Sequence, residues 1–124
     1  MTLACTLLGL SGSLRARSSN TEALRAAAML APEWATVTLF SGLAGLPHFN
    51  PDLDVEGAVL PVPVRESRAQ VDAVDALLVC SPEYAHGVPG SLKNALDWLV
   101  SGAEIPLDST GEYRQRRAEL AARR

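Results

Sequence analysis

The chain has 124 residues, a net charge of −3 and 48% hydrophobic residues, values that suit one folded domain and exclude a disordered chain. Because acidic residues outnumber basic ones and no apolar stretch is long enough to cross a bilayer, the composition favours neither nucleic acid nor a membrane as a partner. The first ten residues lack the basic segment and cleavage site of a secretory signal, so we expect a cytoplasmic protein.

The first strand and the first helix are separated by a polar loop. Leu3–Leu10 has no polar alternation, which is typical of a central parallel strand covered on both faces. Thr21–Leu30 is rich in Ala and Leu and predicts a helix. Either Ser19, with Glu22 three residues later, or Asn20 can cap this helix.

The middle of the chain predicts a second strand, a long loop and a second helix. Ala35–Phe40 alternates and carries β-branched residues, which favours a strand. Residues 41–57 are rich in Gly, Pro and Asp and predict a surface loop long enough to be functional. Residues 61–74 suit a helix, whose start Pro61 and Pro63 should delay.

A third strand and a third helix complete the pattern. Ala76–Cys80 predicts a buried strand, and Gly90–Val100 carries an apolar stripe at helical spacing. The order β-α-β-α-β-α predicts an α/β protein with a doubly wound parallel sheet in three α/β/α layers. We expect one domain over residues 1–105. A divergent basic tail follows at 106–124, and its composition is compatible with a helix. The tail contains no recognisable fourth or fifth strand.

The loop after the first strand is dense in hydrogen-bond donors. It delivers hydroxyls and a guanidinium to the start of a helix, where free N–H groups and the helix dipole favour an anion. The lysine of a P-loop and the GxGxxG fingerprint are both absent, which favours a terminal monophosphate bound without a metal. Arg17 is interpreted as a solvated charge. The residues that carry this interpretation are the Ser11-Gly12-Ser13 turn, Arg15, Ser18 and Asn20.

A second loop, residues 81–90, leaves the third strand at the same edge of the sheet. Ligands of open α/β sheets bind at that edge, and the Pro and Gly residues here give a constrained backbone that can lie against a flat ring. Tyr84 and His86 offer planar faces or polar tips. His86 is either a proton donor or a residue that shapes the pocket, and Glu83 is either a functional acid or a structural hydrogen-bond partner.

Other polar residues have simpler interpretations. Lys93 and Asp97 are four residues apart on one helix and predict a surface ion pair. Trp98 is interpreted as a core or interface residue, and His48 has no second ligand at metal spacing. We expect no metal site.

An esterase is a further alternative. Residues 9–13 come within one residue of the GxSxG nucleophile elbow, with Ser11 as the nucleophile. Ser13 stands where the second Gly of the elbow should be, and no Asp–His pair is evident. This hypothesis therefore ranks below phosphate binding.

Two motifs carry a resemblance to a known family. Residues 12–20 match GSLRxxSxN, and residues 81–99 match SPEYxxGxPGxLKNALDWL. Over about residues 3–102 the chain resembles the NADPH-dependent FMN reductase family, a flavodoxin-like group that includes quinone, azo-dye and chromate reductases.

The resemblance implies a flavodoxin-like fold that binds FMN. NAD(P)H would pass a hydride to FMN, and the electrons would go on to a quinone, an azo compound, a metal ion or free flavin. No side chain need act as a catalytic acid or base. The resemblance also implies a homodimer or homotetramer, with Lys93 and Asp97 near the contact. By the same resemblance, the phosphate ligands would be Ser11, Ser13, Arg15, Ser18 and Asn20. The residues bordering the ring would be Pro82, Glu83, Tyr84 and Gly87, with His86 beside it.

The chain departs from the family at its end. Family members continue with two more strands, and the sequence after residue 105 does not resemble them. We therefore expect a shortened member whose third strand is a bare edge. The leading hypothesis is an FMN-dependent NAD(P)H oxidoreductase; the alternative is a truncated, non-catalytic flavin-binding or subunit-association remnant of that family.

Overall fold

The structure, a computed structural model, describes residues 4–100, in which three parallel strands form one sheet. β1 (Cys5–Ser11) is the central strand, with β2 (Ala35–Leu39) on one side and β3 (Ala76–Cys80) on the other. This order and direction confirm the predicted parallel α/β sheet. The predictions of a divergent tail at 106–124 and of an absent fourth and fifth strand fall outside the described residues.

Burial along the strands follows their position in the sheet. In β2 the exposed threonines alternate with half-buried apolar residues, as the alternating sequence predicts. β1 has three consecutive buried residues at its centre, since it is covered on both faces. β3 is only half-buried, and Val79 is exposed, because within residues 4–100 this strand lies at the edge of the sheet.

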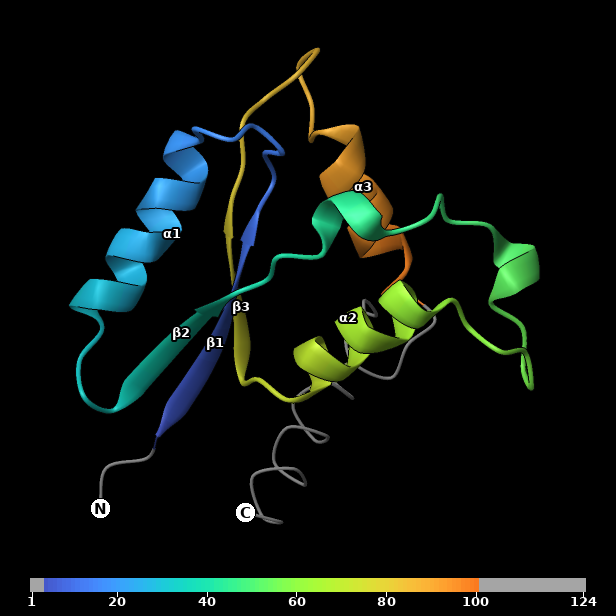
Figure 1. Ribbon diagram of the computed structural model, residues 1–124, viewed down its shortest axis with the longest axis horizontal. Helices are drawn as coiled ribbons and strands as arrows, with labels where there is room; N and C mark the ends of the chain where they lie inside the picture. Colours follow the sequence, from blue (N-terminus) through green and yellow to red (C-terminus); the bar gives the residue numbers. More distant parts are fainter. Residues whose placement is uncertain (1–3, 101–124) are drawn as a thin grey trace.

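Helices cover both faces of the sheet (Figure 1). α1 (Ser19–Leu30) lies on one side, and α2 (Val62–Asp72) and α3 (Gly90–Asp97) lie on the other. α2 begins directly after Pro61, so the predicted delay is wrong: proline is tolerated in the first helical turn, where its missing N–H has no partner to lose. α3 ends at Asp97, three residues before the predicted Val100.

The core lies mainly between the sheet and the α2–α3 layer. It is made by buried side chains from β1, α2 and the α3 region: Leu8, Leu10, Val71, Leu92 and Leu99. On the other face, Leu24 of α1 is fully buried, and its side chain lies against Gly9 of β1. Burying side chains of this size stabilises the fold by about 1.5–3 kcal/mol each.

The long loop after β2 contains two short 3₁₀ helices, η1 (Leu43–Gly45) and η2 (Pro51–Leu53), and is fastened to the α3 region. Trp98 is fully buried, as predicted for a core residue, and its indole Nε1 donates to the carbonyl of Pro47 at 2.8 Å. Asn94 donates to the same carbonyl at 2.9 Å and accepts the N–H of Phe49 at 2.7 Å. Three hydrogen bonds therefore hold the first half of the loop on α3.

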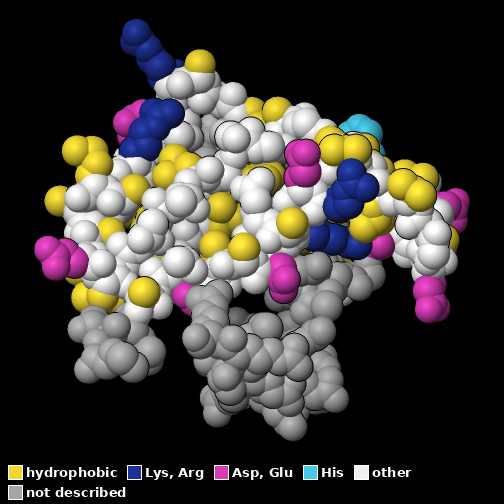
Figure 2. Space-filling view, turned by 60° about the horizontal axis from the view of Figure 1, so that its bottom comes forward, with side chains coloured by type: hydrophobic (Ala, Val, Ile, Leu, Met, Phe, Trp, Pro, Cys, Tyr) yellow, Lys and Arg dark blue, Asp and Glu magenta, His cyan; other side chains and the backbone are white. Residues whose placement is uncertain are grey.

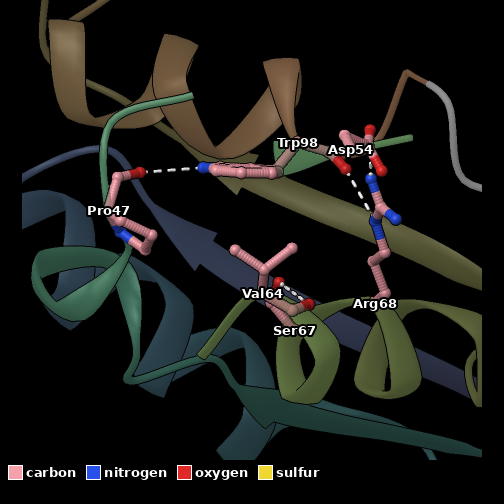
Figure 3. Close-up of polar contacts among 6 residues, drawn as sticks. All are labelled: Pro47, Asp54, Val64, Ser67, Arg68 and Trp98. Carbon is pink, nitrogen blue, oxygen red and sulfur yellow. Dashed lines mark hydrogen bonds and ion pairs between the residues drawn. The ribbon is translucent and has the colours of Figure 1, made fainter. Parts of the chain in front are cut away.

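A second fastening holds the loop to α2 (Figure 3). Arg68 donates through Nη2 to Asp54 and through Nε to the carbonyl of Trp98, each at 2.8 Å. Both charged side chains are only about a tenth exposed, at 11% and 10%. Ion pairs with so little solvent lose less to screening than surface pairs do, so Arg68 joins the loop, α2 and the end of α3.

The surface is mixed in character. On the face shown in Figure 2, basic and acidic side chains are interspersed, and hydrophobic side chains are spread over the face. Among residues 4–100, no helix is long and apolar enough to span a membrane.

Candidate functional site

The two loops singled out in the sequence meet at the carboxyl edge of the sheet, at the top of Figure 1. Ser11, the last residue of β1, is in register with Cys80, the last residue of β3. The next N–H, that of Gly12, donates to the carbonyl of Cys80 at 2.8 Å. A Cβ atom at Gly12 would lie 2.4 Å from Oγ of Ser81, so only glycine allows this approach.

A chain of hydrogen bonds orders the first loop. The N–H of Ser13 donates to Oγ of Ser11 at 3.3 Å, and the N–H of Arg15 donates to Oγ of Ser13 at 3.2 Å. The hydroxyl of Thr21, in the first turn of α1, donates to Oγ of Ser11 at 2.8 Å. The loop is therefore tied to the strand before it and to the helix after it.

Ser18 caps α1. Its side chain is buried and accepts the N–H of Thr21 at 3.3 Å. The prediction that Ser19 or Asn20 is the cap was wrong, and both residues instead lie in the first helical turn. Within residues 4–100 the N–H groups of Ser19 and Asn20 have no hydrogen-bond partner, as is usual for the first turn of a helix. These groups can bind an anion.

Positive charge is available beside these donors. Arg15 and Arg17 are exposed, and neither guanidinium forms an ion pair within the described part of the chain. Arg25, one to two turns into α1, is instead paired with Glu22. Among residues 4–100, no neighbouring carboxylate therefore neutralises the charge of Arg15 or of Arg17.

A hollow of about 320 Å³ adjoins the first loop. Of the residues that line the hollow, the sequence pointed to Ser11 and Ser13. It did not point to the lining residues of α1 or of the segment after β2. No local motif marks the segment after β2, because it reaches the hollow only through the parallel arrangement of β1 and β2. The residues that the sequence missed include Thr21, Arg25, Phe40, Ser41 and Leu43.

The second loop has a different construction. Tyr84 and Gly87 exchange two backbone hydrogen bonds, of 3.1 and 3.0 Å, around a two-residue turn. Both turn residues, Ala85 and His86, have positive φ values of 49° and 59°, a conformation that usually requires Gly or Asn. Every residue from 83 to 88 is exposed, while Pro82 is half-buried and Pro89 is buried. The tip therefore projects into solvent between a half-buried and a buried proline.

The predicted ring-side residues lie together on this tip. Nδ1 of His86 is 3.6 Å from a carboxylate oxygen of Glu83, and both side chains are largely exposed. Among residues 4–100, no hydrogen bond or ion pair joins the side chains of residues 82–87 to those of residues 11–20. The two groups share one edge of the sheet without touching through polar side-chain contacts.

The other sequence interpretations can be placed as well. Lys93 and Asp97 form the predicted surface ion pair, and His48 is exposed. No group of three potential metal ligands occurs in the described ranges. The hydroxyl of Ser11 contacts Thr21 and Ser13 but no histidine, so the esterase arrangement is absent from this part of the chain.

The chain is an α/β protein with a parallel sheet and a donor-rich turn between its central strand and the following helix. Many α/β proteins use such a turn to bind phosphate groups at the carboxyl edge. The chain matches the NADPH-dependent FMN reductase family over residues 5–119, and it belongs to that family. This confirms the resemblance and extends the matched region beyond the expected 3–102.

Individual relatives agree with this assignment. The chain is 41% identical over 100 residues to an NAD(P)H-dependent FMN reductase of Pseudomonas aeruginosa, covering 81% of this chain and 52% of that protein. It is 35% identical to a quinone reductase of Escherichia coli, covering 77% and 50%. A solved structure of FerB, a flavoenzyme NAD(P)H:(acceptor) oxidoreductase from Paracoccus denitrificans, superposes with a TM-score of 0.69 at 30% identity, covering 82% and 54%. The chain thus spans about half the length of these relatives.

Proposed function

We propose that this chain binds FMN at the carboxyl edge of its sheet and works as an NAD(P)H-dependent oxidoreductase with a quinone as acceptor. The observation that carries the proposal is the first loop. It combines oriented hydroxyls with N–H groups at the start of α1 and an Arg15 guanidinium that have no partner among residues 4–100. The relatives of this chain that are named FMN reductase and quinone reductase support the choice of cofactor and acceptor.

The donor set of the loop fits the phosphate end of FMN. A phosphate monoester presents several acceptor oxygens and negative charge, and the loop offers N–H, O–H and guanidinium donors. The nearby carboxylate of Glu22 is already paired with Arg25, which limits its repulsion of an anion. Ser11, Ser13, Arg15, Ser18 and Asn20 are the proposed phosphate ligands.

The second loop would border the flavin ring. Its exposed backbone and the faces of Tyr84 and His86 can lie along a planar ligand, and the closely packed Gly12 fixes its base beside the phosphate loop. The bound flavin would supply the redox chemistry, the transfer of a hydride from NAD(P)H onward to an acceptor. The protein would bind and orient it, and no side chain is assigned as a catalytic acid or base.

Arg15→Ala tests the placement of the phosphate. A charge-assisted hydrogen bond is worth about 1.5–3 kcal/mol, so FMN affinity, measured by quenching of flavin fluorescence, should fall by about ten- to a hundredfold. Riboflavin, which lacks the phosphate, should bind both proteins equally. Arg17→Ala is the matched control, because it removes another exposed arginine from the same loop and should change FMN affinity less than threefold. Unchanged FMN binding by Arg15→Ala contradicts the proposed site.

A second candidate is flavin binding without turnover. The exposure of every residue from 83 to 88 favours it, since this half of the site has little support within residues 4–100. Oxidation of NAD(P)H by the FMN-loaded chain in the presence of a quinone distinguishes the two functions. Turnover well above that of free FMN supports the oxidoreductase; FMN binding with no added turnover supports the second candidate.

The remaining proposals concern partners and location. We propose a homodimer or homotetramer that works in the cytoplasm, with the surface around Lys93 and Asp97 near the contact. Size-exclusion chromatography with light scattering gives the subunit number. A double charge reversal at these two positions should then lower the apparent mass if the surface forms the contact.

A further inference from the structure

Thr21, in the first turn of α1, uses both of its hydrogen-bond donors inside the protein. Its N–H donates to Oγ of Ser18 at 3.3 Å, and its hydroxyl donates to Oγ of Ser11 at 2.8 Å. Thr21 therefore has no hydrogen left to offer a ligand. It instead connects the start of α1 to the end of β1, ten residues earlier in the chain.

The hydrogen bonds of Ser11 determine whether its hydroxyl donates or accepts. A serine hydroxyl has two lone pairs and one hydrogen. One lone pair of Ser11 accepts from Thr21 and the other accepts the N–H of Ser13. With both lone pairs occupied, the hydroxyl of Ser11 can act only as a donor.

Among residues 4–100, the hydroxyl hydrogen of Ser11 has only a poor acceptor. Its acceptor is the carbonyl oxygen of Ser13 at 3.5 Å, whereas a good O–H···O bond measures about 2.7–2.8 Å. The hydrogen of Ser11 can therefore turn to a better acceptor at little cost. A ligand at this position has to be an acceptor, and an anionic oxygen is the strongest one.

We propose that Thr21 is a positioning residue that fixes the hydroxyl of Ser11 as a donor toward the phosphate of FMN. The proposal rests on the proposed function, since it needs the phosphate to lie in the first loop. Without the hydroxyl of Thr21, one lone pair of Ser11 becomes free and the hydroxyl can rotate into orientations in which it does not donate to the ligand. Thr21 therefore acts through Ser11, because both of its own donors are used inside the protein.

The test compares Thr21→Val with Thr21→Ser in the full chain. Valine keeps the shape and the β-branch but removes the hydroxyl, and serine restores it. Binding of FMN and of riboflavin is measured by fluorescence quenching, and unfolding is followed by circular dichroism. Thr21→Val should weaken FMN binding by about fivefold, the worth of one hydrogen bond, with less than a twofold change for riboflavin. Thr21→Ser should bind FMN within about twofold of the unaltered chain.

A double-mutant cycle with Ser11→Ala provides the sharper readout. If Thr21 acts through Ser11, Thr21→Val should have no further effect on FMN affinity once the hydroxyl of Ser11 is gone. A structural role of Thr21 would weaken FMN and riboflavin alike and would persist in the Ser11→Ala background. Should the valine variant not fold, Thr21→Ala replaces it in the same cycle.

The outcomes separate this inference from the proposed function. If Arg15→Ala loses FMN selectively but Thr21→Val does not, the role of Thr21 is wrong while the phosphate site stands. Equal losses of FMN and riboflavin in Thr21→Val also overturn the inference. If the unaltered chain shows no preference for FMN over riboflavin, both proposals fail together.

Discussion

The two loops at the carboxyl edge of the sheet are built on opposite principles. The first loop is ordered by side chains: serine hydroxyls bond to one another and to Thr21, and Ser18 is buried as a helix cap. The turn of the second loop is held by two backbone hydrogen bonds between Tyr84 and Gly87. Its side chains are all exposed, including the Glu83–His86 pair. The first is therefore preorganised for a polar group, and the second presents a surface.

The difference also appears in backbone energetics. Residues in the left-handed region cost about 1–2 kcal/mol each when they carry a Cβ atom, and the second loop holds two such residues in sequence, Ala85 and His86. Such strain persists only where the structure dictates it, and it is frequent at ligand sites. Here the two backbone bonds between Tyr84 and Gly87 maintain it, without packing around the tip.

Gly12→Ala should produce the largest effect on stability, because it acts where the two loops meet. The added Cβ would lie 2.4 Å from Oγ and 2.9 Å from Cβ of Ser81. Relieving that overlap should cost about 2 kcal/mol of unfolding free energy and push the loops apart, lowering FMN affinity as well. Urea denaturation and flavin titration measure the two effects. Gly45→Ala is the control, since a Cβ there meets no atom within 4 Å.

Ser18→Ala should have a smaller effect confined to the first loop. It removes the side chain that accepts the N–H of Thr21 and should cost about 1 kcal/mol. The matched variant Ser19→Ala alters the neighbouring exposed serine and should leave the unfolding free energy nearly unchanged. A larger loss in Ser19→Ala would mean that the cap is one residue further along.

His86→Gly should have the smallest effect, and the opposite sign. Glycine adopts positive φ without strain, so the unfolding free energy should rise by about 0.5–1 kcal/mol after allowance for the more flexible unfolded chain. Gly57→Ala, at a φ of 80°, is the reciprocal control and should destabilise the protein by a similar amount. Destabilisation by His86→Gly would show that the side chain, and not the backbone, holds the second loop.

Local sequence patterns predicted most of the fold. The bounds of β3 were predicted to the residue, because Ala76–Cys80 is a short apolar run between a charged residue and a Ser-Pro turn. The N-cap of α1 was not predicted correctly. Ser18, Ser19 and Asn20 are all good caps, and the path of the preceding loop decides among them.

The unpredicted parts of the site depend on contacts between distant residues. Thr21 and Ser11 are ten residues apart with a loop between them, so no helical or strand spacing marks their hydrogen bond. Arg68 contacts Asp54 and the carbonyl of Trp98, fourteen and thirty residues away. Such partners are chosen by tertiary packing, which a single sequence does not display.

The central position of β1 has a consequence for synthesis on the ribosome. Of the three strands, β1 is synthesised before β2 and β3. Its two edges are hydrogen-bonded only after β2 and then β3 have been made. Asp75, whose carboxylate accepts the N–H of Thr6 at the base of β1, is made 69 residues later. At usual elongation rates this is a delay of roughly 3–14 s. During that interval β1, the most buried of the three described strands, has an unpaired edge, and a chaperone that shields it would raise the yield of folded protein.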